Sequence, residues 1–497
     1  MRFQQLTLQP LTWSAHQVVM RFLLDDLEFT TSYWYPDIHL LALERRFGRP
    51  FLERLLVHAA LFECNKLASL RVERLSLGVY AHHHTQALEQ LWTTIFDKVW
   101  AQWRYENQLP FEKAPRFAST PVDEVPLPVV RDLHADEVLL FCGGGKDSLV
   151  SMKLLERAGI PFVSFAYTSS VYGPAAFQFQ LLEGLLREGI PLQRHRMTVQ
   201  DDLFDAPVLE LFGPTHGVQT ITAAETPSSI FAVLPILLSR GYAHAILGNE
   251  ASANRGNLIW PITGEEVNHQ WGKSVEAEGL LDRYIREHLV ADIGIFSVLM
   301  PLHDVLIFEL LRQDEGSLHA THSCNVAKPW CRRCAKCAYV WLNCRAHLSE
   351  APVQNLFRED LLEVPENQHF FRDMMGLGVH TPFECIGQIE ESRLALHLCG
   401  ARGLLGPFGR SLLASLPPIP LQEVLDRFTQ VHAVKARLPE SYAAPLLKQM
   451  DAAALRARAR IQAVLAHDTS ALEVQRMASP NPKRRMPWRL GTSPTPE

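Results

Sequence analysis

A glycine-rich segment at residues 138–156 constrains the fold more than any other part of the chain. It reads VLLFCGGGKDSLVSMKLLE: a short apolar run, three glycines, three polar residues, and then apolar residues at helical spacing. This pattern predicts a strand, a tight turn and a helix. Glycines let the backbone approach a ligand closely, and the free N–H groups of a helix N-terminus favour an anion. Lys146 and Ser148 beside the glycines favour a phosphate site over a simple turn.

Two other glycine loops do not fit this segment. A Walker A loop requires Gly at position 140 and Ser or Thr at 147, where this chain has Leu140 and Asp147. A dinucleotide-binding fingerprint is matched only in part, because Ser148 stands at its third small position. The segment instead resembles the PP-loop of ATP pyrophosphatases, usually S-G-G-x-D-S. The resemblance implies ATP binding and pyrophosphate release by Gly143, Gly144, Gly145, Lys146, Asp147 and Ser148, with Gly143 replacing the first Ser.

Length and composition indicate a multidomain globular protein. A chain of 497 residues suggests about three domains. No run of eighteen apolar residues appears, and the N-terminus has no basic region followed by an apolar core. We therefore expect a cytoplasmic protein without a membrane partner. The formal net charge of −6 gives no general attraction for nucleic acid, so we expect no nucleic-acid partner either. The sequence leaves the oligomeric state open.

The order of patterns predicts an α/β fold in four regions. Residues 1–130 mix helical patches at 37–47 and 51–61 with a strand at 70–80, which predicts an α+β domain. Residues 131–350 alternate strands with helices and predict a parallel-sheet nucleotide-binding domain, which the resemblance identifies as a PP-loop core. Residues 351–470 predict a mainly helical region, with helices at 421–438 and 442–467. Residues 471–497 are Pro-rich and basic, and predict a disordered tail.

The strands of the second region place further residues at the proposed nucleotide site. We predict strands at residues 137–141, 161–167, 192–197 and 244–247. In parallel sheets ligands bind beyond the carboxyl ends of the strands, where the glycine loop falls. Thr168, Gly248 and Asn249 follow two other strands and are predicted to wall the same site, although strand ends are commonly polar. The run His82, His83 and His84 is interpreted as surface or packing residues.

Four cysteines form a candidate metal site. Nine cysteines occur in the chain, and five of them lie between residues 324 and 344. Cys324, Cys331, Cys334 and Cys337 form C-x6-C-x2-C-x2-C, whose short spacings can close a tetrahedral Zn²⁺ site. An iron–sulfur cluster on three of them, or Cys344 as an alternative ligand, stays open. The same order of a Pro-Leu pair, a helix and a Ser-Cys element before the cysteines resembles the PP-loop enzyme that makes 7-cyano-7-deazaguanine.

Further segments resemble one family more closely. GNEASANRGN (248–257), VNHQWGKSVEAE (267–278), KPWCRRCAKCAYV (328–340) and TPFECIGQIEESRLAL (381–396) are similar to bacterial UDP-N-acetyl-α-D-muramoyl-L-alanyl-L-glutamate epimerases. That resemblance implies that ATP and Mg²⁺ are used to invert the terminal L-Glu of a nucleotide-sugar peptide. It implies an acyl-adenylate, AMP and diphosphate as products, and a place in peptidoglycan synthesis. Lys146 would then offset developing charge, and Asp147 would help to place Mg²⁺.

The proton-transfer residues of such an epimerase are not identified by sequence alone. Inversion requires a proton acceptor on one face of the α-carbon and a donor on the other. The candidates are His269, Lys273, Glu384 and Cys385, with His303 and His322 as weaker ones. Cys385 has an alternative interpretation as a packed core thiol. Arginines available for the anionic substrate are Arg194, Arg196, Arg255 and Arg393, unless they form surface salt bridges.

Two alternative functions remain at this point. A PP-loop enzyme that adenylates a nucleobase, in 7-cyano-7-deazaguanine synthesis or tRNA thiolation, would share the loop and the cysteines. A tRNA enzyme would more often carry a clear basic face, which this sequence lacks. A non-catalytic nucleotide sensor would bind ATP without turnover.

Overall fold

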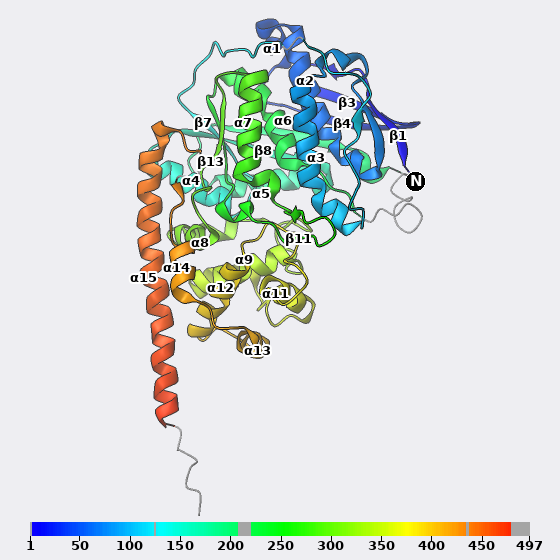
Figure 1. Cartoon of the computed structure of the whole chain (residues 1–497). Helices are drawn as coiled ribbons and strands as arrows, with labels where there is room; N and C mark the ends of the chain where they lie inside the picture. The colour runs from blue at the N-terminus through cyan, green and yellow to red at the C-terminus, as the bar shows by residue number, and fades with distance from the viewer. Residues whose placement is uncertain (1, 124–125, 207–219, 434–436, 479–497) are drawn as a thin grey trace, which may run out of the picture.

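The computed structural model describes residues 2–123, 126–206, 220–433 and 437–478 (Figure 1). In this part of the chain, eleven strands form one mixed sheet. Its order is β13-β10-β7-β8-β9-β4-β3-β1-β5-β6, with β2 paired to β3. The α/β class expected from the sequence is confirmed, and the sheet has a parallel half and a mainly antiparallel half.

The parallel half carries the glycine loop. Its strands are β7 (Val138–Phe141), β8 (Phe162–Ser169), β9 (Arg194–Asp201), β10 (His244–Leu247) and β13 (Gly294–Ser297). The four predicted strands are confirmed within a few residues, and β13 was not predicted. The chain runs from β7 through β8 to β9 in one direction, and then returns to β10 on the other side of β7. The end of β7 is therefore the switch point at which open α/β sheets bind ligands.

The N-terminal strands extend this sheet. They are β1 (Phe3–Leu8), β2 (Thr12–Trp13), β3 (Gln17–Leu24), β4 (Leu27–Trp34), β5 (Val72–Ser76) and β6 (Arg116–Phe117). The predicted strand at 70–80 is shortened to β5, and β1, β3 and β4 were not predicted. β4 pairs antiparallel with β9, with Tyr33 opposite Val199 and Thr31 opposite Asp201. This β4–β9 seam joins the first region to the second, so the boundary at residue 130 stays a prediction and does not interrupt the sheet.

Both faces of the parallel half are covered by apolar residues. Leu139 of β7 packs into one core cluster, while its neighbours Val138 and Leu140 pack into the other. Successive side chains of a strand point to opposite faces, which explains the continuous apolar run that precedes the glycines. The glycine loop is therefore held by a strand that is anchored on both sides.

Seven helices that precede residue 290 flank the sheet in the described part of the chain. They are α1 (Leu40–Phe47), α2 (Arg49–Glu63), α3 (Gln86–Glu106), α4 (Lys146–Ala158), α5 (Ala175–Leu186), α6 (Glu225–Arg240) and α7 (Val275–His288). Residues of α2, α3, α6 and α7 belong to the core cluster that contains Leu139. Residues of α4 and α5 belong to the cluster that contains Val138 and Leu140. The predicted helices at 37–47 and 51–61 correspond to α1 and α2. The strand–turn–helix reading of the glycine segment is confirmed by β7 and α4.

The C-terminal region is helical, as expected. Its helices are α8 (Asp304–Arg312), α9 (Ala335–His347), α10 (Glu350–Phe357), α11 (Gln368–Met374), α12 (Ile389–Ala401), α13 (Pro407–Ser415), α14 (Leu421–Phe428) and α15 (Glu440–Ala478). In Figure 1, α9 and α11 to α13 gather below the sheet, and α15 runs along one edge of the molecule. α15 packs on α4, α8 and α12, which ties the C-terminal region to the helix after the glycine loop.

Two boundaries differ from the sequence prediction. The helix predicted at 421–438 ends at Phe428, where α14 stops. The tail predicted from residue 471 begins inside α15, which continues to Ala478, and residues 479–497 lie outside the described residues. Among the helices of the described chain, none combines the length and apolar character that crossing a bilayer would require.

Candidate active site

The glycine loop connects β7 to α4 and is closed on one side. Gly144 has a φ of +95°, and a Cβ there would lie 2.1 Å from Nε2 of His322. A Cβ on Gly145 would lie 2.5 Å from Oγ of Ser323. A Cβ on Gly143, in contrast, would meet no atom within 4 Å. The loop therefore packs against the chain that leads to the cysteines and is open at its first glycine.

A cavity of about 270 Å³, here termed the loop cavity, lies in front of this glycine loop. Gly145 is the N-cap of α4, and no side chain caps this helix. The N–H groups of the first helical turn are therefore available to an anion. The predicted nucleotide-site residues that line the cavity are Gly143, Gly145, Asp147, Ser148, Gly248 and Asn249. Backbone donors, a helix N-terminus and an open cavity make this a suitable place for a phosphate group.

Lys146 does not line the loop cavity. Its Nζ lies 2.5 Å from Oδ1 of Asp304 and 2.6 Å from Oδ1 of Asp147. Burial works to lower the pKa of Lys146, but the two carboxylates raise this pKa well above its ordinary value. The ammonium is thus committed to a buried ion pair beneath the loop. Lys146 lines neither the loop cavity nor the larger cavity described below, so its predicted role at the phosphates stays a prediction.

Thr168 is also turned away from the site. Its side chain is fully buried, and its Oγ1 lies 3.4 Å from Oγ1 of Thr198 on β9. Its neighbours on β8, Tyr167 and Ser169, line a cavity instead. Because side chains alternate along a strand, a sequence prediction that finds the right strand end can still choose the wrong face. Tyr167 replaces Thr168 as the residue of β8 that faces the loop cavity.

A second cavity of about 410 Å³ lies beside the β4–β9 seam and is termed the seam cavity. Tyr33 of β4, Val199 of β9 and Lys66 after α2 form part of its wall. On another part of the wall stand three of the four predicted proton-transfer residues: His269, Lys273 and Cys385. The fourth, Glu384, lines neither cavity.

Cys385 and Lys273 form a close pair in the seam cavity. Nζ of Lys273 donates a hydrogen bond of 2.9 Å to Sγ of Cys385. Burial alone would raise the pKa of Cys385, but Lys273 and Lys336 hold this pKa well below its ordinary value. The Cys385 charge in turn raises the pKa of Lys273. The pair is therefore a thiolate beside an ammonium, which is the form in which cysteine acts as a base or nucleophile.

His269 and Glu384 flank this pair. Nδ1 of His269 lies 2.7 Å from Oε1 of Gln102, and His269 also lowers the pKa of Cys385. Glu384 accepts a hydrogen bond of 3.3 Å from Asn325, and burial raises the pKa of its carboxyl group. His269 thus belongs to the electrostatic surroundings of the thiolate. Glu384 lies beside it in the chain and outside the cavity.

The loop cavity and the seam cavity adjoin each other. Residues that line both include Tyr167, Tyr172, Glu225, Lys273, Asn325 and Lys336. Oη of Tyr172 donates a hydrogen bond of 2.6 Å to Oε1 of Glu225. Sequence reasoning missed Tyr172 and Glu225, whose surroundings carry no motif. Lys336, which lies between Cys334 and Cys337, was not predicted as a site residue either.

The cationic groups at the site are lysines, and the arginines proposed from the sequence lie elsewhere. Lys66, Lys273, Lys328 and Lys336 line one cavity or both. Arg194 and Arg196 pair with Glu183, Arg255 pairs with Glu390, and Arg393 donates to the carbonyl of Met375. None of these four arginines lines either cavity. Three of the four therefore form the salt bridges that the sequence analysis gave as their alternative role, and Arg393 makes a backbone contact.

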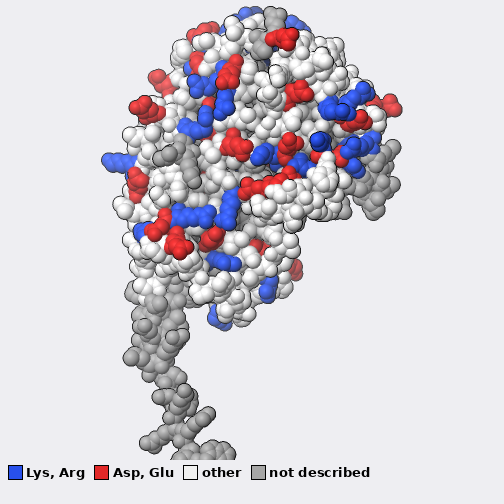
Figure 2. All heavy atoms as spheres, in the orientation of Figure 1, with Lys and Arg blue, Asp and Glu red and all other residues white. Residues whose placement is uncertain are grey.

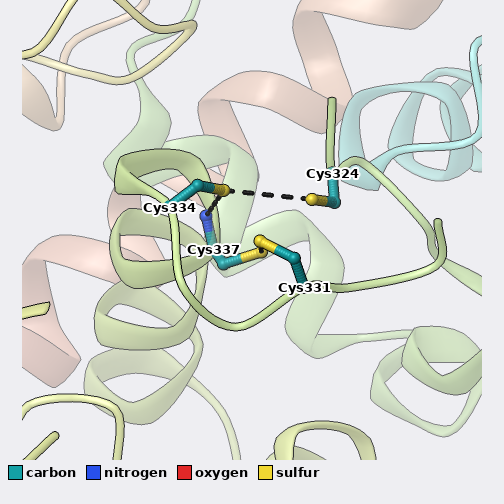
Figure 3. A group of neighbouring side chains, drawn as sticks. All are labelled: Cys324, Cys331, Cys334 and Cys337. Atoms are coloured by element: carbon teal, nitrogen blue, oxygen red, sulfur yellow. Dashed lines mark hydrogen bonds between the residues drawn. The ribbon is translucent and has the colours of Figure 1, made fainter. Parts of the chain in front are cut away.

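The four predicted metal ligands come together in the structure (Figure 3). Sγ of Cys324 lies 3.9 Å from Sγ of Cys334, and Sγ of Cys331 lies 3.8 Å from Sγ of Cys337. Four thiolates around Zn²⁺ at about 2.3 Å stand about 3.8 Å apart in a tetrahedron. The spacing therefore fits a structural zinc site. Cys344 does not belong to this group of ligands.

Residues adjacent to the cysteine cluster form part of the wall of the loop cavity. Backbone N–H groups of Val326 and Ala327 lie 3.4 Å from Sγ of Cys324. Cys334 is the N-cap of α9, and Lys336 follows in its first turn. Ser323, Asn325, Lys328 and Lys336 all line the loop cavity. The chain folded around the four sulfurs thus supplies polar groups to the site.

Comparison with known proteins identifies relatives over much of this chain. A model described as the MurL N-terminal domain matches residues 71–298, and one described as the MurL C-terminal domain matches residues 318–403. These matches contain the glycine loop and the cysteine cluster, respectively.

Three relatives are named UDP-N-acetyl-alpha-D-muramoyl-L-alanyl-L-glutamate epimerase. That of Salinispora tropica is 33% identical over 316 residues, which cover 62% of this chain and 65% of the relative. That of Micromonospora sp. is 33% identical over 343 residues, covering 67% and 72%. That of Xanthomonas oryzae pv. oryzae is 31% identical over 301 residues, covering 57% and 62%. In two of the three, the match spans slightly less than two thirds of the relative. Two family models and these identities together place the chain in the MurL family.

Proposed function

We propose that this protein inverts the terminal L-Glu of UDP-N-acetylmuramoyl-L-Ala-L-Glu to D-Glu for peptidoglycan synthesis. ATP is consumed, and AMP and diphosphate are released. The names of the relatives support the substrate and the inversion. The observation that carries the proposal is the direct contact between two cavities, one at a glycine loop and one containing a Lys273–Cys385 pair. A carboxylate activated at the first cavity lies next to a base in the second.

The glycine loop is the proposed ATP site, as in a PP-loop enzyme. The open position at Gly143 and the uncapped N-terminus of α4 suit the phosphates. Asp147 lines the cavity and is the proposed ligand side chain for Mg²⁺, which neutralises phosphate charge when bound with ATP. Lys328 and Lys336 replace Lys146 as the proposed cations of this site, because both line the loop cavity.

Activation of the carboxylate explains why an epimerase requires ATP. Removing the α-proton beside an ionised carboxylate would place two negative charges on adjoining atoms. Adenylation removes the first charge, so the α-proton becomes acidic enough for a side chain to accept it. Reprotonation of the planar enolate on its other face inverts the centre, and hydrolysis of the adenylate releases the D-Glu product. The carbon atom therefore needs one protein group on each face.

Lys273 and Cys385 cannot serve both faces. Groups that react with one carbon from opposite sides each approach it to about 3–3.5 Å, and are thus about 6 Å or more apart. Nζ of Lys273 and Sγ of Cys385 are 2.9 Å apart. We therefore assign the pair to a single face, with the Cys385 thiolate as the proton acceptor and Lys273 as the group that stabilises the thiolate.

Tyr172 is the proposed donor for the opposite face. It lines both cavities and comes from the chain after β8, whereas Cys385 precedes α12. Burial and the neighbouring Glu225 raise the pKa of Tyr172, and the Cys385 charge raises it further. The phenol therefore keeps its proton until an enolate requires it. Glu225 accepts the Tyr172 hydrogen bond and orients the hydroxyl group.

The reaction is tested by incubating the protein with ATP, Mg²⁺ and UDP-N-acetylmuramoyl-L-Ala-L-Glu in D₂O. AMP, diphosphate, and the configuration and α-deuterium content of the glutamate are measured. The proposal expects α-deuterated D-Glu together with AMP. Asp147→Ala should abolish AMP formation without unfolding the protein, whereas Asp26→Ala, an exposed carboxylate, should behave as the wild type. Unlabelled L-Glu without AMP from the wild type would reject this substrate.

The two-face assignment has its own test. Tyr172→Phe should still place deuterium at the α-carbon of L-Glu, because Cys385 can remove and return a proton on its own face, but should form little D-Glu. Cys385→Ser should retain AMP formation and lose exchange from the L-epimer. Wild-type rates of D-Glu formation by Tyr172→Phe would remove the tyrosine from the mechanism.

The cysteine cluster beside the glycine loop favours a second candidate, adenylation of a nucleobase in tRNA or a free base. The charge on the face in Figure 2 does not support it, since Lys and Arg are interspersed there with Asp and Glu. Filter binding with tRNA at several salt concentrations separates the epimerase from an enzyme that acts on tRNA. Tight binding with a steep salt dependence would favour the nucleobase enzyme.

A further inference from the structure

Three side chains far from the cysteine cluster in the sequence converge between α2 and the 3₁₀ helix η2 (Gly78–His83). Glu53 lies in the first turns of α2, and His82 and His83 end η2. One ligand atom of each lies within 4.8 Å of the other two. The two histidines thus face the same carboxylate from the same short element.

The distances do not fit hydrogen bonds. Nε2 of His82 lies 3.6 Å from Oε1 of Glu53, and Nε2 of His83 lies 3.5 Å from the same oxygen. Hydrogen bonds between nitrogen and oxygen are about 2.7–3.2 Å long. Two ligands held about 2.1 Å from one tetrahedral cation, in contrast, stand about 3.4 Å apart. The separation is that of ligands around a shared ion, as it is for the four sulfurs of the cysteine cluster.

His83 provides an independent observation. It is 8% exposed, and its Nε2 has no hydrogen-bond partner among the described residues. A buried polar nitrogen without a partner costs free energy unless another group satisfies it.

The adjacent residues define the shape of the site. The His82 side chain is 59% exposed, which leaves the cluster open toward solvent. His84 does not belong to this group of ligand atoms, and its Nε2 lies 3.4 Å from Oε2 of a different carboxylate, that of Glu89. Three protein ligands and one open position are typical of a site that holds a metal ion together with water.

We propose that Glu53, His82 and His83 bind a divalent transition metal such as Zn²⁺, at a site separate from the four cysteines. Imidazole ligands select this class of metal over Mg²⁺ and Ca²⁺. The ion fastens the beginning of α2 to η2. The other end of α2 carries Glu63, which lines the seam cavity, so the site anchors an element of the cavity wall.

Cobalt titration of the metal-free full-length protein tests this site. We expect two equivalents of Co²⁺ per chain. One should show the intense near-ultraviolet bands of cobalt bound to thiolates and should be lost in Cys334→Ser. The other should show only weak visible bands and should be lost in His83→Ala.

Replacing an exposed residue tests the metal site without removing a buried side chain that the fold could need. His82→Ala removes an exposed ligand, and should weaken the second equivalent by at least about tenfold while leaving the first unchanged. His319→Ala, another exposed histidine, should leave both unchanged. A single equivalent in the wild type, or a second one that persists in both His82→Ala and His83→Ala, would overturn the proposal and indicate an adventitious ion only.

Discussion

Cys385 has the chemistry of a reactive residue because of what surrounds it. A buried thiol ordinarily has a raised pKa, as Cys344 does, whereas the pKa of Cys385 is held well below its usual range by Lys273 and Lys336. Lys273 and Cys385 are 112 positions apart in the sequence. Sequence alone identified both as candidates within polar segments. It could not pair them, because the contact depends on how the loop before α12 folds onto the loop before α7.

Replacing Lys273 is expected to change the protonation of Cys385. The Lys273→Met variant loses the nearest positive charge, so the pKa of Cys385 should rise toward that of an ordinary buried thiol. Thiolate reactivity should then appear only at higher pH, whereas in the wild type it should persist below neutrality. The rate of iodoacetamide modification of Cys385, followed by mass spectrometry between pH 5 and 9, measures this. Lys153→Met is the control, and identical profiles for wild type and Lys273→Met would contradict the assignment.

At the scale of elements, the sequence predictions were correct where the residues that define a feature lie close together in the chain. The strand, glycine loop and helix at 138–158 and the four clustered cysteines depend on short spacings, which a sequence displays directly. β3 was missed although it alternates, with Val18, Met20, Phe22 and Leu24 buried. The partly buried positions between them also carry apolar residues, Val19 and Leu23, which hide the alternation in the sequence.

Two glycines of the loop should respond differently to alanine. Gly144→Ala requires a side chain at φ +95° and moves His322, so it should lower the free energy of unfolding by more than about 1 kcal/mol. Gly143→Ala adds a methyl group where no atom lies within 4 Å, so it should leave the free energy of unfolding nearly unchanged. The added methyl group should weaken ATP binding, because residue 143 lines the loop cavity. Chemical denaturation and ATP titration separate the effects. Equal stability losses in the two variants would contradict this description of the loop.

The cysteine cluster should couple metal binding to the nucleotide site. Cys334→Ser is expected to remove about one zinc per chain and to weaken ATP binding, because the same segment carries Asn325, Lys328 and Lys336 into the loop cavity. Cys344→Ser should keep the metal, since Cys344 is buried outside the cluster. Elemental analysis and ATP titration provide the measurement. Iron with sulfide in the wild type would favour a thiolation enzyme instead.

The whole molecule contains a buried carboxyl group that links its stability to pH. Glu278 on α7 is 2% exposed, and burial raises its pKa from 4.5 to about 7. The folded state therefore binds this proton more tightly than the unfolded state does. The resulting stabilisation is complete below pH 4.5 and is lost as the pH rises through about 7, at about 1.4 kcal/mol per pKa unit.

Glu278→Gln should remove this dependence. The variant should be more stable than the wild type at pH 8, by up to about 3 kcal/mol, with the difference falling to about 1 kcal/mol or less at pH 5. The midpoint of thermal unfolding between pH 5 and 8 measures it. Glu391, whose pKa is also raised to about 7, should leave some dependence of stability on pH in both the wild type and the variant. The exposed Glu287→Gln should match the wild type, and a Glu278→Gln curve parallel to that of the wild type would contradict the prediction.

The β4–β9 seam sets an order of events during synthesis on the ribosome. Thr31 pairs with Asp201, a partner that is translated 170 residues later. At about 5–20 residues per second, the newly made β4 waits about ten to thirty seconds before its partner emerges. During that interval an apolar hairpin presents an unpaired edge, which is a template for association between neighbouring nascent chains. The same seam that forms a wall of the seam cavity in the finished protein therefore leaves the N-terminal hairpin open to such association while the chain is still growing.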